Sequence, residues 1–187
     1  MNNFAQRLAA LRKSMIKKKI SLYIIPSGDP HLGEYIPEHW WLIEWLTGFT
    51  GSSATIVITN EFAGLWTDSR YFIQAEAQLK GSGVTLMNGA DAEADDIYKW
   101  IKNHTPLSSK IGLDGRIFSI SSLRRLEELF KSSKTKIDIA CDLISELWQD
   151  RPLMPEDMAF EHELRYCGVS NKEKIGKVRS IMRQTGV

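Results

Sequence analysis

Residues 48–79 read GFTGSSATIVITNEFAGLWTDSRYFIQAEAQL, and this stretch decides the fold. After a glycine-rich turn it holds two short apolar runs, 53–59 and 62–67, joined by Asn60-Glu61. Short apolar runs joined by so tight a turn predict a β-hairpin. A helical pattern over 71–79 follows directly, so the stretch predicts two antiparallel strands and then a helix.

Outside this stretch, short apolar runs alternate with amphipathic helical patterns. The predicted strands are 21–26, 84–87, 110–113 and 136–140, and the predicted helices are 4–15, 37–46, 94–103, 119–130 and 141–148. Strands that alternate with helices are typical of a sheet covered on both faces. Because the hairpin sets one strand antiparallel to its neighbours, the sequence predicts a three-layer α/β/α domain with a mixed, mostly parallel sheet.

The first domain is expected to span residues 1–150. Residues 151–169 carry two prolines, mixed charge and no clear period, which is typical of a linker. Residues 170–187 then begin with a capping box, Ser170-x-x-Glu173, and read as the first helix of a truncated second domain. Its apolar stripe is expected to pack on protein, either its own domain or another copy; the stripe consists of Ile175, Val178, Ile181 and Met182.

Composition and charge narrow the class of protein. The 187 residues are 43% hydrophobic and 25% charged, which is ordinary for a globular domain. With 24 basic and 23 acidic residues the net charge is +1, so no overall field favours nucleic acid or an anionic membrane. No apolar run approaches the roughly 20 residues that span a bilayer, and the N-terminus lacks the pattern of a secretory signal. The sequence therefore predicts neither a nucleic-acid nor a membrane partner.

The two cysteines, Cys141 and Cys167, match neither a metal clamp nor a disulfide framework. Cys141 follows an apolar run, which favours a buried thiol that behaves as a small hydrophobe. A reducing cytoplasm is the expected location.

Acidic and imidazole side chains gather after the first predicted strand, at Asp29, His31, Glu34 and His39. Such groups could bind a metal or transfer protons. Their spacing matches no ligand motif, and Asp29 before Pro30 is a good turn former, so the residues favour a surface turn over a metal site.

The glycine-rich turn GFTGS raises the possibility of a phosphate loop, because glycines let backbone amides approach an anion. It precedes a strand, however, rather than opening a helix, and it is not GxGxxG. We expect its glycines to permit positive φ in a tight helix-to-strand turn.

Three tryptophans lie in the predicted helix 37–46. Trp41 and Trp45 are four residues apart, so they are expected to share a face and to pack in the core. Trp40 lies a step round the helix. Trp40, or whichever of the three rings points outward, is a candidate for a domain or subunit interface, where tryptophan is enriched.

Arg70 lies where a predicted strand ends and a helix begins, the edge at which open α/β sheets present ligand contacts. Asp68 is placed to cap the helix start. A cation in the first turn is disfavoured by the helix dipole, so Arg70 needs a carboxylate partner or a functional reason. The residues alone favour an ion pair with Asp68 or a glutamate.

The stretch 48–79 and the string IIPSGDPHLGEYI at 24–36 resemble the N-terminal domain of Xaa-Pro aminopeptidases, in the creatinase/prolidase family. The resemblance implies a ribonuclease-H-like topology for the domain. LWQDRP at 147–152 resembles the string that closes the first domain of the three-domain enzymes. The family's usual glycine before the arginine is Ser69 here, a departure that concerns the geometry of the turn.

The resemblance implies an enzyme that removes an N-terminal residue when proline follows it. The family uses two divalent metal ions, typically manganese, and holds them in a C-terminal domain that this chain does not include. The resemblance thus implies a dimeric parent enzyme that acts on peptides with proline in second position, and a fragment without metal ligands or activity of its own.

For Arg70, the resemblance reverses the interpretation from the residues alone. In these aminopeptidases the arginine of the matching W-T-D-x-R-Y string reaches from the N-terminal domain to the peptide substrate. Guanidinium suits that role because its planar donor fork pairs with carbonyl or carboxylate oxygens. Two alternatives stay open: the N-terminal domain of a prolidase- or creatinase-like hydrolase, and a free-standing interaction module of the same fold.

Overall fold

The structure is a computed structural model that describes residues 3–87 and 96–186. It divides into two compact units, Met1–Met154 and Pro155–Val187. Each unit is described by itself.

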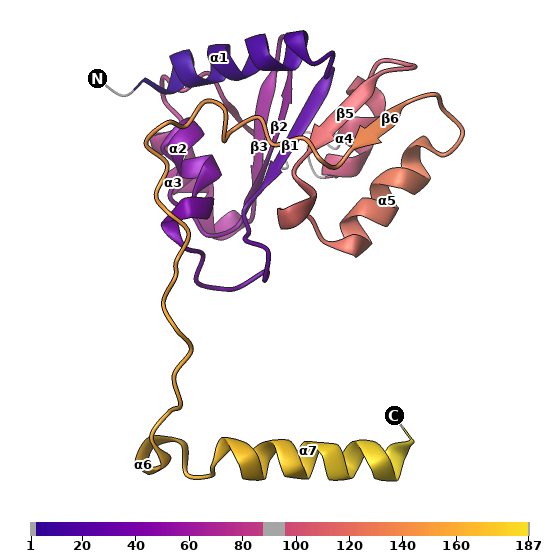
Figure 1. The fold of residues 1–187 in the computed structure, drawn as a ribbon. Helices are drawn as coiled ribbons and strands as arrows, with labels where there is room; N and C mark the ends of the chain where they lie inside the picture. The colour runs from indigo at the N-terminus through magenta and orange to yellow at the C-terminus, as the bar shows by residue number, and fades with distance from the viewer. Residues whose placement is uncertain (1–2, 88–95, 187) are drawn as a thin grey trace. The chain divides into compact units, whose positions relative to one another are not determined.

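The first unit is built on a six-stranded sheet (Figure 1). Its strands follow the order β4-β3-β2-β1-β5-β6 and are β1 (Leu22–Pro26), β2 (Ala54–Thr59), β3 (Ala63–Thr67), β4 (Thr85–Met87), β5 (Lys110–Leu113) and β6 (Lys136–Asp138). The hairpin strand β2 pairs antiparallel with both β1 and β3, and the other three pairs are parallel. The predicted mixed, mostly parallel sheet is confirmed.

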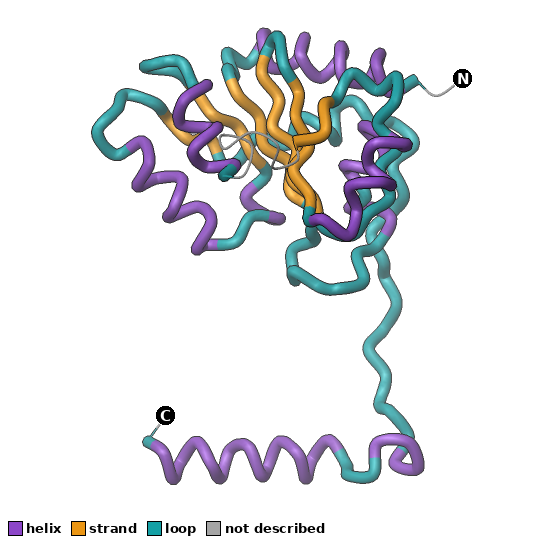
Figure 2. Tube along the Cα trace, turned by 180° about the vertical axis from the view of Figure 1, so that it is seen from behind, coloured by secondary structure: helices purple, strands orange, loops and turns teal. Residues whose placement is uncertain are grey.

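Helices cover both faces of this sheet (Figure 2). The helices of the first unit are α1 (Phe4–Lys17), α2 (Leu42–Thr47), α3 (Phe72–Gln78), α4 (Ile97–His104) and α5 (Ile120–Phe130). Alternate side chains of a strand point to opposite faces, so Tyr23 and Ile25 of β1 join one core cluster with α1, α2 and α3. Leu22 and Ile24 join the other cluster, with α4 and α5. The predicted three layers are confirmed.

The direction of the strands brings the functional candidates to one edge of the sheet. Five strands run parallel to one another and only β2 runs the opposite way, so the carboxyl ends of β1, β3 and β5 lie at the same edge. Asp68 and Arg70 follow β3 there, and a short 3-10 helix (Ser69–Tyr71) leads on to α3. Open α/β sheets present ligand contacts at this edge.

The predicted helix 141–148 is wrong. Only one turn forms, closed by the Trp148 amide on the Ile144 carbonyl at 2.8 Å. The Tyr23 hydroxyl donates to the Cys141 carbonyl at 2.9 Å and accepts from the Leu143 amide at 3.1 Å, which keeps the start of the segment extended. We call residues 141–152 the strap.

The prediction that Trp41 packs in the core together with Trp45 is also wrong. Residues 37–46 do not form one helix, because a 3-10 turn (Glu38–Trp40) precedes α2 and Trp41 lies between the two with ψ at 51°. The break changes the rotation of the side chains. Trp40 is therefore buried and 4% exposed, whereas Trp41 is 41% exposed and Trp45 is buried as predicted.

The other elements differ from the predictions mainly at their ends. The predicted strand 136–140 stops at Asp138, and Ala140 makes only an isolated bridge to Asp114. The predicted helix 94–103 is seen from Ile97, while its first two residues lie outside the described range. Cys141 is buried, as its position after an apolar run predicts.

The second unit holds two helices, α6 (Leu164–Cys167) and α7 (Asn171–Thr185). The short α6 lies inside the segment predicted as linker. Ser170 caps α7 by accepting the Glu173 amide at 3.2 Å, as the capping box predicts. Within this unit the apolar stripe of α7 stays between 45% and 55% exposed; its members are Ile175, Val178, Ile181 and Met182.

Candidate functional site

Arg70 is held by the carboxylate of Asp68. The Arg70 amide donates to Asp68 Oδ1 at 3.0 Å, which caps the short 3-10 helix. The Arg70 guanidinium donates from Nε to Oδ1 at 2.8 Å and from Nη2 to Oδ2 at 2.8 Å. We call this three-bond arrangement the Asp68 clamp. The ion pair predicted for Arg70 and the cap predicted for Asp68 are confirmed.

The clamp leaves most of the Arg70 side chain accessible, at 74% exposure. The hydrogen bond from the Arg70 side chain is the main cause of the lowered pKa of Asp68, so the Asp68 carboxylate stays ionised. The guanidinium carbon lies 5.5 Å from the centre of the Tyr71 ring. The Tyr71 hydroxyl in turn lies 2.7 Å from Ser52 Oγ, which ties this ring to the glycine-rich turn.

A hollow of about 460 Å³ lies beside this polar edge. Thr50, Gly51 and Ser52 form one wall, so Ser52 belongs both to the hollow and to the contact with Tyr71. The rest of the lining is mainly aromatic and aliphatic, with Trp40 and Trp41, and it also includes Glu34 and Glu44. The edge thus combines an exposed guanidinium with a largely apolar depression, which suits a peptide better than a small anion.

The same clamp recurs after β5. Arg116 donates its amide to Asp114 Oδ1 at 3.0 Å, and its Nε and Nη2 reach the carboxylate at 2.9 and 2.7 Å. Asp114 and Asp68 each precede a 3-10 helix and each cap it. With β2 and β1 between β3 and β5, the two clamps are three strand spacings apart, about 14 Å at ~4.8 Å per strand.

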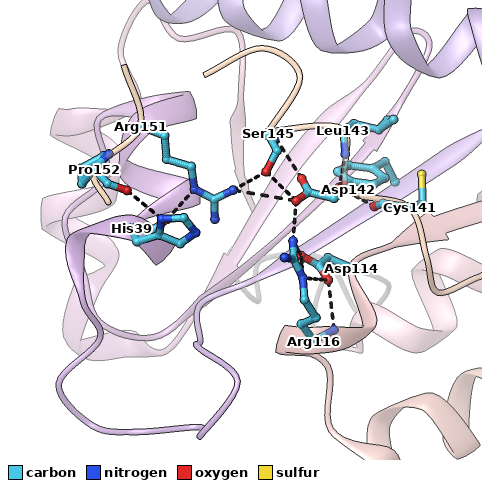
Figure 3. Close-up of polar contacts among 10 residues, drawn as sticks. His39, Asp114, Arg116, Cys141, Asp142, Leu143, Ser145, Arg151 and Pro152 are labelled. Carbon is cyan, nitrogen blue, oxygen red and sulfur yellow. Dashed lines mark hydrogen bonds and ion pairs between the residues drawn. The ribbon is translucent and has the colours of Figure 1, made fainter. Parts of the chain in front are cut away.

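The second clamp belongs to a larger network of polar contacts (Figure 3). Arg116 Nη2 also donates to Asp142 of the strap. Arg151 lies 3.8 Å from the same carboxylate, donates from Nη1 to Ser145 Oγ at 2.5 Å, and donates from Nε to the His39 carbonyl at 2.7 Å. His39 Nδ1 donates to the Pro152 carbonyl at 2.7 Å. These contacts fasten the strap to the domain.

Burial and charge act against each other in this network. Burial opposes the ionisation of Asp142, but hydrogen bonds from Ser145 and the charges of Arg116 and Arg151 outweigh it and lower its pKa. Burial lowers the pKa of Arg151, whose side chain is only 7% exposed, and Asp142 opposes that change. Burial likewise raises the pKa of the Cys141 thiol to about 11, so this thiol is unreactive at neutral pH.

The acidic and imidazole residues after β1 have structural roles or lie exposed on the loop. Asp29 is buried, and its Oδ1 accepts the amides of His31 and Gly33 at 2.9 and 3.0 Å, which is the turn predicted from the sequence. His31 and Glu34 are exposed, and His39 belongs to the strap network. The four side chains thus lie in three different surroundings, and the structure does not bring them together as one site.

The glycine-rich turn begins with a residue, Gly48, whose backbone has the left-handed conformation. Gly48 ends α2 with φ at 78°, as predicted for a helix-to-strand turn. A Cβ at Gly48 would also come within 2.7 Å of the Phe4 ring. The predicted positive φ is wrong for Gly51. A Cβ there would lie 2.2 Å from the Phe49 ring, so close packing explains this second glycine.

Comparison with known proteins identifies this arrangement. The profile of the Creatinase/Prolidase N-terminal domain matches residues 7–146. The chain belongs to the creatinase/prolidase family. The resemblance seen in its sequence is therefore confirmed.

Relatives of this creatinase/prolidase domain cover nearly all of it. The chain is 35% identical over 183 residues to Xaa-Pro aminopeptidase 2 of Rattus norvegicus, an alignment that covers 97% of this chain and 27% of the rat protein. It therefore spans about a quarter of that relative's length.

Solved structures extend the comparison. An X-prolyl aminopeptidase from Caenorhabditis elegans, described as a cytosolic enzyme with a di-nuclear active site, matches with a TM-score of 0.84 and 26% identity, over 98% of this chain and 32% of that one. An Xaa-Pro dipeptidase from Bacillus anthracis shares the fold, with a TM-score of 0.56 and 20% identity, over 78% of this chain and 36% of that one.

The described side chains of this creatinase/prolidase domain form no candidate metal site. Across residues 3–87 and 96–186, no three or more His, Cys, Asp or Glu side chains gather in a way that could hold a metal ion. Over the same residues, no helix is both long and apolar enough to cross a bilayer.

Sequence reasoning missed the strap network of this creatinase/prolidase domain. Arg116, Asp142 and Arg151 lie far apart in the chain, and each reads alone as a surface charge. One signal could have found part of it: Asp68-Ser69-Arg70 and Asp114-Gly115-Arg116 are both Asp-x-Arg strings that directly follow a strand.

Proposed function

We propose that the complete protein is a metal-dependent Xaa-Pro aminopeptidase and that this chain is its non-catalytic N-terminal domain. The proposal is carried by how much of the chain the relatives match. The family profile ends at residue 146, whereas the rat Xaa-Pro aminopeptidase aligns over 97% of the chain and so includes most of the residues that follow. The match to the worm aminopeptidase covers 98% of this chain and so includes most of the second unit, whereas the match to the bacterial dipeptidase covers 78%. This favours the three-domain aminopeptidase over a prolidase.

The substrates of the proposed enzyme are peptides with proline in second position. Two divalent metal ions, which we expect to be manganese, would activate the attacking water and polarise the scissile carbonyl. We place their ligands in the part of the relatives' length that lies beyond this chain, so residues 1–187 alone are expected to be inactive. A cytosolic homodimer is the proposed form of the complete enzyme, and the location is supported by the worm relative, which is a cytosolic enzyme.

The role proposed for this domain is to help close the substrate site through Arg70. The side chain is exposed, its fork is oriented by Asp68, and it lies at the sheet edge where this class of fold binds ligands. A guanidinium held in this way can donate to a peptide carbonyl or carboxylate oxygen.

Replacing Arg70 by alanine in the complete enzyme tests this role. We expect kcat/KM for Xaa-Pro peptides to fall about ten-fold or more, because a contact made in the transition state is lost. Arg70→Lys is expected to restore little, since a point charge does not reproduce the planar fork.

Two controls belong with this assay. The thermal unfolding temperature of Arg70→Ala is expected to stay near that of the parent, because the side chain is exposed. Residues 1–187 alone, assayed with added Mn²⁺, give the background rate of peptide hydrolysis, because this part of the proposed enzyme is expected to be inactive. Unchanged kcat/KM in Arg70→Ala across short and long peptides would return Arg70 to a structural role.

A further inference from the structure

We infer that Asp68 is the positioning residue for Arg70, which orients the guanidinium so that its outer edge meets an oxygen of the peptide substrate. The inference rests on the proposed role of Arg70 and adds the residue through which that role is exercised. It is carried by the geometry of the clamp and by a second copy of that geometry in the same domain.

The clamp uses only one edge of the guanidinium. An arginine has five N–H donors, and Asp68 engages Nε and one hydrogen of Nη2. Within residues 3–87 and 96–186, no other hydrogen bond or ion pair engages the Arg70 guanidinium. The Nη1–Nη2 edge, which faces away from the carboxylate, is the donor pair that a carboxylate or carbonyl oxygen can meet.

The second clamp shows what this outer edge does when an acceptor is present. Arg116 is held by Asp114 through the same Nε and Nη2 contacts, and its Nη2 donates in addition to Asp142, which lies 26 residues away in the strap. The domain thus contains one clamped arginine whose outer edge holds a carboxylate and one whose outer edge is open. The arginine with the open edge, Arg70, is the more exposed of the two, at 74% against 52% for Arg116.

The clamp matters because Arg70 is a surface residue. An exposed arginine samples many rotamers, and ordering it on binding costs conformational entropy. Asp68 removes much of that freedom in advance, and the Tyr71 ring at 5.5 Å limits the guanidinium on a second side. Preorganisation of this kind strengthens a contact without adding a new one.

The test is Asp68→Asn in the complete enzyme. Asparagine is also a good capping residue, so its Oδ1 can still accept the amide of residue 70. Its side-chain NH₂ replaces Oδ2, however, and cannot accept from Nη2, so the clamp is lost while the turn is kept. We expect kcat/KM for Xaa-Pro peptides to fall about five- to ten-fold with little change in the thermal unfolding temperature.

Asp114→Asn is the matched control. It breaks the same bonds around Arg116, whose outer edge is already occupied by Asp142. We expect it to lower the unfolding temperature and to leave kcat/KM within about two-fold of the parent. An equal loss of kcat/KM in both variants would overturn the inference, because the effect would then be structural.

A double-mutant cycle separates the inference from the proposed function. If Asp68 acts through Arg70, Asp68→Asn should lower kcat/KM no further in an Arg70→Ala background. Independent losses that multiply would overturn the positioning role. If Arg70→Ala lowers kcat/KM and Asp68→Asn does not, the role of Arg70 stands and this inference fails. If Arg70→Ala changes nothing, the proposed role of Arg70 itself fails.

Discussion

At the residue scale, the carboxylate of Asp142 is one of the groups that connect the strap to the rest of the domain. Asp142 lies between Arg116 and Arg151 and accepts from Ser145, while Arg151 is almost wholly buried. A buried charge that loses its partner is strongly destabilising, because the remaining charge is desolvated and unpaired. The ion pair of Asp142 with the buried Arg151 therefore matters more for the stability of the fold than an exposed pair such as Lys18–Glu146.

Asp142→Asn is expected to lower the free energy of unfolding by about 1–3 kcal/mol at neutral pH. The pKa of Asp142 is lower in the folded chain than in the unfolded one, so its contribution is complete above the ordinary carboxyl pKa, about 3.9. That contribution is lost as the pH falls through the lowered value. Urea unfolding at pH 7 and at pH 3 should show the difference between parent and variant shrink on acidification.

The control for this prediction is Glu146→Gln, which removes an exposed ion pair from the same strap. Its effect on the free energy of unfolding is expected to stay within about 0.5 kcal/mol. A pH-independent loss in Asp142→Asn would contradict the linkage argument, because the loss would then come from packing rather than from charge.

Sequence reasoning at this scale worked where a side chain acts on its own neighbourhood. Asp29 forms its turn and Asp68 caps and pairs with Arg70, all within a few residues. The strap network could not be predicted, because it depends on contacts across 26 residues for Arg116 and 112 for Arg151. Such contacts follow from topology and leave no local pattern.

At the element scale, the sheet was predictable and the strap was not. The short apolar runs and the hairpin turn specify the strands locally, and the alternation of strands with helices specifies the layers. In the strap, Leu143, Ile144, Leu147 and Trp148 have the spacing of a helix face, yet all four pack on the core while only one turn forms. Tertiary contacts there override the local pattern.

Tyr23→Phe tests that explanation of the strap. The hydroxyl is buried and bonds both the Cys141 carbonyl and the Leu143 amide, so its removal leaves two buried backbone groups without this partner. We expect the free energy of unfolding to fall by about 1–3 kcal/mol and amide exchange to speed up at Leu143. Tyr35→Phe, at a tyrosine that is 90% exposed, is the control and should change neither.

At the scale of the whole molecule, the first unit contains a complete core, whereas within the second unit α7 has no core of its own to pack on. The first unit buries two apolar clusters, one on each face of its sheet. In the second unit, α7 has 15 residues and a half-exposed apolar stripe. A helix of this length is marginal in water by itself, whereas burial of four such side chains could supply roughly 1.5–3 kcal/mol each.

We therefore expect α7 to be stable only when the rest of the proposed enzyme covers its stripe. Hydrogen exchange on the chain alone should show fast exchange over Asn171–Thr185, and the complete enzyme should protect the same amides. Leu22–Pro26 in the centre of the sheet is the internal control and should be protected in both. Equal exchange of α7 in the two proteins, or protection that rises with the concentration of the chain alone, would contradict the prediction, because the stripe would then remain open or pair with another copy.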